Sequence, residues 1–145
     1  AKHCGLHLAR WTSAAAAPGI VLGVGNVGVR LSDNPAHHSV FVARDAGLSW
    51  SFALSGPHSV TILGHGDILL AVPSQAPWKP VSSVDGGATW KAVELPRGGD
   101  ASATVQGLFT HPSHTDLRAF LLLGSDESSS VMLAALDLAG ALPQA

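Results

Sequence analysis

The sequence has no tyrosine, a single cysteine, few charged residues and no long uninterrupted apolar run. The absence of tyrosine excludes a tyrosine nucleophile. Only 12% of the residues are charged and the net charge is −2 with the histidines neutral, which argues against nucleic acid or an anionic membrane surface as a partner. Residues 14–29 form the longest apolar stretch, but proline, glycine and asparagine interrupt it, and it is shorter than the ~20 apolar residues that a bilayer requires.

The lone cysteine, Cys4, has no partner for a disulfide within these 145 residues. It is either a buried free thiol or one half of a disulfide whose other half lies outside them. The chain also begins without methionine, which indicates processing or excision from a longer polypeptide.

Short apolar runs separated by turn residues predict an all-β chain. The 16 glycines and 9 prolines favour turns between short strands rather than long helices. We expect strands at residues 19–24, 39–43, 49–54, 59–63, 68–72, 80–84, 89–94, 103–109, 117–123 and 130–138. Residues 68–72 and 120–123 are apolar without alternation, which predicts burial on both faces. Residues 91–94 are more polar and suit an outer strand. Helix is expected only at residues 13–17 and 136–142.

An internal repeat is the strongest feature of the sequence. Residues 42–50 align with residues 82–90, which places Asp45 and Asp85 40 residues apart. The shared pattern is Ser/Thr-x-Asp-x-Gly-x-Ser/Thr-Trp, known as an Asp box. In such a hairpin the carboxylate accepts backbone N–H bonds from the residues that follow, and glycine supplies a positive φ. The structural residues we assign to the boxes are Asp45, Gly47, Trp50, Asp85, Gly87 and Trp90.

The alternative for each box is an ordinary Asp-Gly hairpin, which is common in β proteins. The first box is also imperfect, because Ala43 replaces the hydroxyl residue that Ser83 supplies in the second. Two matches that include both tryptophans, at a spacing of roughly 40 residues, nevertheless favour blades of a β-propeller.

We therefore predict a partial β-propeller of about two and a half four-stranded blades. Residues 1–145 form a single segment of a larger propeller domain, with blade-like units at approximately 1–54, 58–94 and 101–138. Because such a segment cannot close a ring and would leave exposed strand edges, we expect upstream blades on the same polypeptide or on a tightly bound partner.

Two sequence patterns could indicate a nucleotide cofactor or a metal ion, but their surroundings argue against both interpretations. Residues 23–28 match Gly-x-Gly-x-x-Gly, but a turn rather than a phosphate-binding helix follows them. The pairs His3/His7 and His111/His114 have ligand-like spacing without accompanying cysteines or carboxylates in a recognised pattern. We expect no cofactor and no metal.

Further short motifs lie around the two boxes. They are Cys4-Gly5-Leu6-His7-Leu8-Ala9, the stretch 17–28, Gly56-Pro57-His58, the stretch 64–72, Gly107-Leu108-Phe109-Thr110-His111-Pro112 and Leu136-Asp137-Leu138. Their order and spacing resemble the C-terminal blades of the luminal Asp-box propeller in the sortilin family of sorting receptors. His111 stands where that family usually has glutamate.

The resemblance implies a luminal or extracellular segment of a single-pass membrane protein of the Golgi, endosomes or cell surface. The complete propeller is expected to bind peptide or protein cargo, and a cysteine-rich module is expected after Ala145. No ligand contact is carried over to these residues, and the segment itself is expected to touch neither membrane nor nucleic acid. The resemblance also favours a disulfide between Cys4 and upstream sequence. Our hypothesis for cargo release in acidic compartments is protonation of His58 and His65.

An Asp-box glycoside hydrolase of the sialidase type is the alternative function. Tyrosine, the usual sialidase nucleophile, is absent. The carboxylates left for an ordinary acid–base pair are Asp67, Asp100, Asp116, Asp126 and Glu127, all in turn-like contexts. We therefore expect no catalytic residue and no enzymatic activity in this segment.

Overall fold

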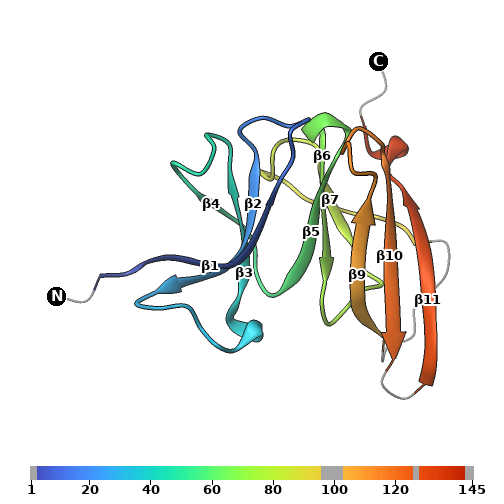
Figure 1. The fold of residues 1–145 in the computed structure, drawn as a ribbon, viewed down its shortest axis with the longest axis horizontal. Helices are drawn as coiled ribbons and strands as arrows, with labels where there is room; N and C mark the ends of the chain where they lie inside the picture. Colours follow the sequence, from blue (N-terminus) through green and yellow to red (C-terminus); the bar gives the residue numbers. More distant parts are fainter. Residues whose placement is uncertain (1–2, 96–102, 126–127, 143–145) are drawn as a thin grey trace.

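The computed structural model describes residues 3–95, 103–125 and 128–142. These residues form three antiparallel sheets that lie side by side along the long axis of the molecule (Figure 1). The first sheet contains β1 (Gly5–Ser13), β2 (Val21–Gly28), β3 (Ser39–Ala43) and β4 (Ser51–Leu54). The second contains β5 (His58–Leu63), β6 (Ile68–Pro73), β7 (Val81–Ser83) and β8 (Lys91–Ala92). The third contains β9 (Thr104–Thr110), β10 (Arg118–Ser125) and β11 (Ser128–Asp137).

In every sheet the strand order follows the sequence, so each sheet is an up-and-down meander. The first strands of successive sheets also lie next to one another, because β5 contacts both β1 and β9. Sheets that share an inner line of first strands and pack face to face are the arrangement of propeller blades. The predicted all-β, partial-propeller fold is confirmed.

The second sheet is covered on both faces, as its sequence predicts. All five residues from Ile68 to Val72 are completely buried. Ile68, Leu70 and Val72 belong to a core shared with the third sheet, whereas Leu69 belongs to a core shared with the first. The unbroken apolar run of β6 therefore serves two interfaces at once.

The same expectation for residues 120–123 was wrong. Leu121 and Leu123 are buried against the second sheet, but Phe120 on the opposite face is 39% exposed. The difference arises because, among the described residues, no further sheet packs on the outer face of the third. The polar outer strand expected at residues 91–94 is confirmed in β8, whose two residues are exposed.

Both helix predictions were wrong. Residues 14–17 form a turn in which the Ala17 amide donates to the Ala14 carbonyl oxygen, and Ala17 is buried in the core rather than on a helix face. At the other end β11 continues to Asp137, and only a short 3-10 turn, η3 (Ala139–Ala141), follows. The two other 3-10 turns are η1 (Pro35–His37) and η2 (Gly64–Gly66). Within the described ranges no helix is long and apolar enough to span a membrane.

Candidate functional site

The first Asp box forms the turn between β3 and β4. Asp45 Oδ1 accepts a hydrogen bond of 2.9 Å from the Ser49 amide, and Asp45 Oδ2 accepts one of 2.5 Å from the Ser49 hydroxyl. Ala46 and Gly47 take positive φ values of 61° and 95°, which reverses the chain. Trp50 Nε1 then donates to the Gly47 carbonyl oxygen at 3.0 Å. Local bonds of this kind fix the turn without help from distant sequence.

The second box forms the equivalent turn between β7 and β8 and carries more hydrogen bonds. Asp85 accepts from both the amide and the hydroxyl of Thr89, and Trp90 Nε1 donates to the Gly87 carbonyl oxygen at 3.1 Å. In addition, the buried Ser83 hydroxyl donates to Asp85 Oδ1 at 2.7 Å and accepts from the Gly87 amide at 2.8 Å. Ala43 occupies the Ser83 position in the first box and offers neither bond.

These bonds also determine the acidity of the box carboxyls. The Ser49 hydroxyl holds the pKa of Asp45 below its ordinary value, and Thr89 together with Ser83 lowers the pKa of Asp85 strongly. A carboxyl that stays ionised and already accepts several hydrogen bonds is poorly suited to donate a proton as a general acid. Both aspartates are thus hydrogen-bonded within their own turns.

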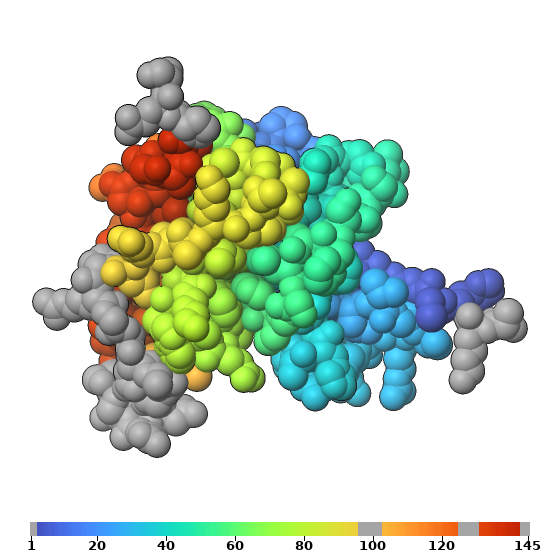
Figure 2. Space-filling model, turned by 180° about the vertical axis from the view of Figure 1, so that it is seen from behind, coloured from blue at the N-terminus to red at the C-terminus, as the bar shows by residue number. Residues whose placement is uncertain are grey.

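The two boxes touch each other across the boundary between the first two sheets. Arg44, the residue before Asp45, donates from Nε to the Gly86 carbonyl oxygen at 3.1 Å. Val42 Cγ2 lies only 2.9 Å from the position that a Cβ would occupy on Gly87. In the space-filling view from behind, the teal segment of the first box lies beside the yellow segment of the second (Figure 2). Sequence analysis missed Arg44, because its partner lies 42 residues away.

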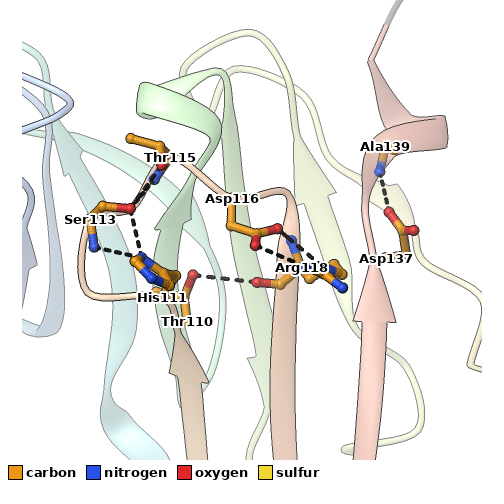
Figure 3. Close-up of polar contacts among 8 residues, drawn as sticks. All are labelled: Thr110, His111, Ser113, Thr115, Asp116, Arg118, Asp137 and Ala139. Carbon is orange, nitrogen blue, oxygen red and sulfur yellow. Dashed lines mark hydrogen bonds and ion pairs between the residues drawn. The ribbon is translucent and has the colours of Figure 1, made fainter.

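The turn between β9 and β10 carries a group of exposed polar contacts (Figure 3). The Ser113 hydroxyl lies 2.7 Å from His111 Nδ1 and 2.8 Å from the Thr115 hydroxyl. Asp116 and Arg118 form an ion pair with Oδ2 and Nη2 3.2 Å apart, which lowers the pKa of Asp116 and raises that of Arg118. These are exposed contacts within one turn, and exposed pairs of this kind contribute little to stability.

The turn also contacts the second sheet through its backbone. The Gly64 amide donates to the Asp116 carbonyl oxygen at 3.1 Å, and the His65 amide donates to the His114 carbonyl oxygen at 2.9 Å. His114 Nδ1 lies 2.9 Å from the Ile62 carbonyl oxygen. The turn is therefore one of the places where the second and third sheets are joined.

The histidine pairs do not converge on a common point. His114 is directed at the Ile62 carbonyl oxygen while His111 contacts Ser113, and His7 Nε2 lies 3.1 Å from the Gly28 carbonyl oxygen. No group of three or more metal-ligating side chains occurs among the described residues. The glycines of residues 23–28 lie in β2, where a Cβ on Gly25 would fall 1.9 Å from the His7 carbonyl oxygen. They permit close strand packing and present no helix N-terminus to a phosphate.

His58 and His65 lie at opposite ends of the hairpin that β5 and β6 form. His58 is 7% exposed, its Nδ1 lies 2.9 Å from the Gly56 carbonyl oxygen, and burial lowers its pKa. His65 is exposed in η2 with a φ of 60°. The structure therefore does not unite the two histidines in one cluster.

Of the remaining candidates in the described residues, Cys4 and Asp67 are exposed and Asp116 is partly exposed. Cys4 is exposed and has no disulfide partner in the sequence. Asp67 and Asp116 lie in separate turns, while Asp100, Asp126 and Glu127 lie outside the described residues. Asp116 forms its ion pair with Arg118.

Among the hollows on the surface of the described residues, two lie where neighbouring sheets meet. An open concavity of about 270 Å³ follows the inner strands β1, β5 and β9 and is lined by Arg10, Trp11, Thr12, Ser59, Val60 and Leu108. A groove of about 460 Å³ lies at the opposite, outer edge, between β8 and the end of β11. Sequence analysis predicted neither, because both are assembled from residues that come together only when neighbouring sheets pack.

Comparison with known proteins gives a consistent result. Residues 2–108 match the Sortilin-Vps10 family model, described as sortilin, neurotensin receptor 3. The chain is 40% identical over 109 residues to a vacuolar protein sorting/targeting protein 10 from Emericella nidulans, covering 74% of the chain and 7% of that relative. Proteins of the same name from Uncinocarpus reesii and Verticillium alfalfae are 36% identical over 126 and 127 residues, covering 86% of the chain and 8% of each relative. The chain thus spans less than a tenth of the length of these relatives.

Proposed function

The chain belongs to the Sortilin-Vps10 family, and on that premise we propose that residues 1–145 are a single segment of a larger β-propeller. The complete propeller forms the luminal or extracellular part of a single-pass membrane receptor of the Golgi, endosomes or cell surface. It binds peptide or protein cargo for sorting between the Golgi and endosomes, and a cysteine-rich module of the same receptor follows it.

One observation carries this proposal. The two Asp-box hairpins occupy the same place, between the third and fourth strands, in adjacent sheets, and both fall within the residues that match the family. A box that recurs at the same position in successive sheets supports a repeated radial architecture. The three relatives from Emericella nidulans, Uncinocarpus reesii and Verticillium alfalfae carry the name of vacuolar sorting proteins, which supports a receptor rather than the hydrolase alternative.

The surface is consistent with binding rather than catalysis. The box carboxylates are occupied by their own turns. The concavity along β1, β5 and β9 is shallow and open, and it mixes Arg10 and Thr12 with the apolar surface of Trp11. Small-molecule sites are usually deeper and enclose most of the ligand. A shallow mixed surface suits contact with an extended peptide.

We also propose that Cys4 forms a disulfide with a cysteine outside these residues. Its exposure in the structure supports this assignment, because an exposed thiol is accessible to a partner segment. Peptide mapping of the receptor under non-reducing conditions should find the Cys4 peptide linked to a second peptide. Recovery of Cys4 as a free thiol would contradict the proposal.

The receptor function is tested by recovering the complete, tagged polypeptide from Golgi and endosomal membranes after chemical cross-linking near neutral pH. Mass spectrometry should find soluble luminal proteins enriched several-fold over an untagged control. The matched variants are Leu48→Ala, at a side chain that is 90% exposed on the tip of the first box, and Trp90→Ala, at a partly buried side chain that packs against the core between the first two sheets. The first should retain the cargo and the second should lose it. The absence of any enriched soluble protein would contradict the proposal.

A further inference from the structure

A further hollow, of about 290 Å³, lies among loops at one end of the molecule. Three segments meet there, namely the loop that carries η1, the link between β4 and β5, and the loop that follows β6, and all three lie at the lower end of Figure 1. The lining includes Ala36, Pro57, His58, Pro73, Gln75 and Ala76. No lining residue carries a permanent charge, so the hollow combines proline and alanine surface with neutral polar groups.

His58 is the buried polar side chain of this lining, with only 7% of its surface exposed. Its Nδ1 lies 2.9 Å from the Gly56 carbonyl oxygen. Because a carbonyl oxygen can only accept, Nδ1 carries the proton and the neutral ring presents a lone pair at Nε2. Burial lowers the pKa of His58, which keeps the ring in this neutral form near neutral pH.

Nε2 of His58 is an acceptor without a partner. The hydrogen bonds of this ring within the described residues end at Nδ1. No side-chain nitrogen or oxygen in the described part of the chain is completely buried without a partner, so Nε2 must be reachable from outside. The hollow that His58 lines provides this access. A largely buried acceptor that lacks a partner favours a ligand that supplies a donor, because leaving such a group unpaired costs free energy.

The apolar walls beside His58 are held by backbone hydrogen bonds. The Ser74 amide donates to the Pro57 carbonyl oxygen at 3.0 Å, and the Ala76 amide donates to the Pro73 carbonyl oxygen at 3.3 Å. The two prolines also have a fixed φ, which limits the movement of the chain on either side. The walls are therefore formed before a ligand arrives, and binding requires little further ordering of the protein.

We propose that this hollow binds an uncharged stretch of extended peptide, which donates one N–H to Nε2 of His58 and packs one apolar side chain against Pro57 and Pro73. A peptide fits because each residue of an extended chain offers a donor and a side chain close together. The stretch is uncharged because no lining residue compensates a charge. The volume is at the low end for ligand pockets, so the hollow takes a short part of a longer peptide. The inference rests on the proposed function, since the peptide is part of the cargo.

Few charged or titratable groups surround the ring of His58. Strands β2, β4, β6 and β9 carry none. From β1, Arg10 donates to the His58 carbonyl oxygen at 2.5 Å, while His7 contacts the far end of β2. In η1, His37 bonds a hydroxyl of its own loop, and His65 in η2 lies at the other end of the hairpin. Protonation of His58 removes the lone pair at Nε2, so binding should weaken as the pH falls below the ordinary histidine pKa of about 6.5.

Photocross-linking of the complete polypeptide tests the proposal. The probe is a library of blocked peptides of alanine, valine, proline, serine and threonine, each with one uncharged photoreactive residue. Mass spectrometry near neutral pH should place the label on residues 55–58 and 73–76, and the label should decrease several-fold at about pH 5.5. Sodium chloride should leave the labelling near neutral pH unchanged, because no charge takes part. Labelling that spares both segments, is equal at the two pH values or is lost in salt would overturn the proposal.

Substitutions at His58 test the role of its ring. His58→Ala removes the acceptor and should weaken binding of the labelled peptides about three- to tenfold, as expected for one neutral hydrogen bond. His58→Gln supplies an amide oxygen that does not titrate, so its labelling should be the same at both pH values. Unchanged binding in His58→Ala, or a pH dependence that persists in His58→Gln, would contradict the contact with Nε2.

A substitution at the rim tests the hollow without disturbing a buried side chain. Gln75 is exposed, and Gln75→Arg adds bulk and charge at the opening, so it should reduce the labelling several-fold. Gln106→Arg makes the same change at an exposed residue of β9 and should leave the labelling unchanged. Equal labelling in the two variants would refute the site. So would protection of residues 55–58 and 73–76 by a rising concentration of the polypeptide alone, because a second copy would then be the occupant.

Recovery of soluble luminal proteins from membranes reports separately on the receptor function. Cargo that Gln75→Arg recovers as well as the unsubstituted receptor would leave the proposed function intact and refute this hollow as a cargo site. The absence of any recovered cargo from the unsubstituted receptor would instead contradict the proposed function itself.

Discussion

Arg10 Nη2 lies 2.5 Å from the carbonyl oxygen of His58, and this hydrogen bond joins the inner strand of the first sheet to the start of the inner strand of the second. His58 also begins the strand directly after the link Ser55-Gly56-Pro57 between the two sheets. The contact therefore fixes one sheet against the next close to the axis that the inner strands share. At the outer edge of the same boundary, Arg44 and Gly86 make a comparable contact. Two arginines thus join the first two sheets, one at each edge.

The Arg10 contact can be measured by replacing Arg10 with methionine, which keeps much of the aliphatic stem and removes the charged donor. We expect the free energy of unfolding to fall by about 1 kcal/mol, the low end for a charge-assisted hydrogen bond, because Arg10 is exposed. Urea unfolding followed by circular dichroism gives the value. Arg30→Met is the control, since Arg30 is exposed and only its backbone oxygen takes part in a described hydrogen bond. Equal effects of the two substitutions would refute the structural role of Arg10.

The two Asp boxes differ because the second has Ser83 where the first has Ala43. Reciprocal substitutions at these two positions should therefore have opposite effects on the stability of the chain. Ser83→Ala removes a buried hydroxyl that bonds Asp85 and the Gly87 amide, and it should destabilise the chain by about 1–2 kcal/mol. Ala43→Ser places a hydroxyl at the matching point of the first box and should stabilise the chain by up to about 1 kcal/mol. Thermal unfolding of both variants checks the pair. A destabilised Ala43→Ser variant would show that the first box cannot accept the bonds of the second.

Because the pKa values of the two Asp-box carboxyls are lowered in the folded state, we expect the protein to lose stability in acid. Hydrogen bonding lowers the pKa of Asp85 in the folded state, so the unfolded state binds the proton more readily. The stabilisation is complete above the ordinary aspartate pKa of about 3.9 and decreases as the pH falls below it. In Asp85→Asn the dependence of unfolding free energy on pH should be shallower below about pH 4. Asp45→Asn should flatten it less, because Asp45 lacks the bond that Ser83 supplies.

Burial of His58 should make the stability of the protein depend on pH in a second, less acidic range. Burial lowers the pKa of His58 in the folded state, so the unfolded state again binds the proton more readily. Stability should be complete above the ordinary histidine pKa of about 6.5 and should decline as the pH falls through it. His58→Gln should reduce this decline, while His65→Gln, at an exposed turn, should leave it unchanged. If the decline persists in His58→Gln, another group causes it, and the histidine hypothesis of cargo release loses its support at this residue.

The boxes could be predicted because their chemistry is local. An aspartate, a glycine and a hydroxyl residue within five positions determine the turn, and the tryptophan ring closes it onto the Gly47 or Gly87 carbonyl. The strands after the boxes were expected to begin at residues 49 and 89, but they begin at Ser51 and Lys91. The reason is that the turn extends through the tryptophan.

Strand β1 and the two segments predicted as helices depend on contacts between residues that are distant in the sequence. Strand β1 was not predicted, because residues such as His7, Arg10 and Thr12 break the apolar pattern and the strand is stabilised by pairing with β2. Residues 136–142 have helix-forming composition, yet Leu136 and Leu138 are buried in the core between the last two sheets. Tertiary burial overrides helix propensity in both helix predictions.

A structure of the complete polypeptide by electron cryo-microscopy would test most directly whether these residues are consecutive blades of a closed ring. We predict that the sheets β1–β4, β5–β8 and β9–β11 occupy three neighbouring radial positions, with both Asp boxes on the outer edge. A sheet of the same polypeptide should cover Trp50. An open stack in which Trp50 and Phe52 face solvent, or a fold that places the two boxes within one sheet, would contradict the account.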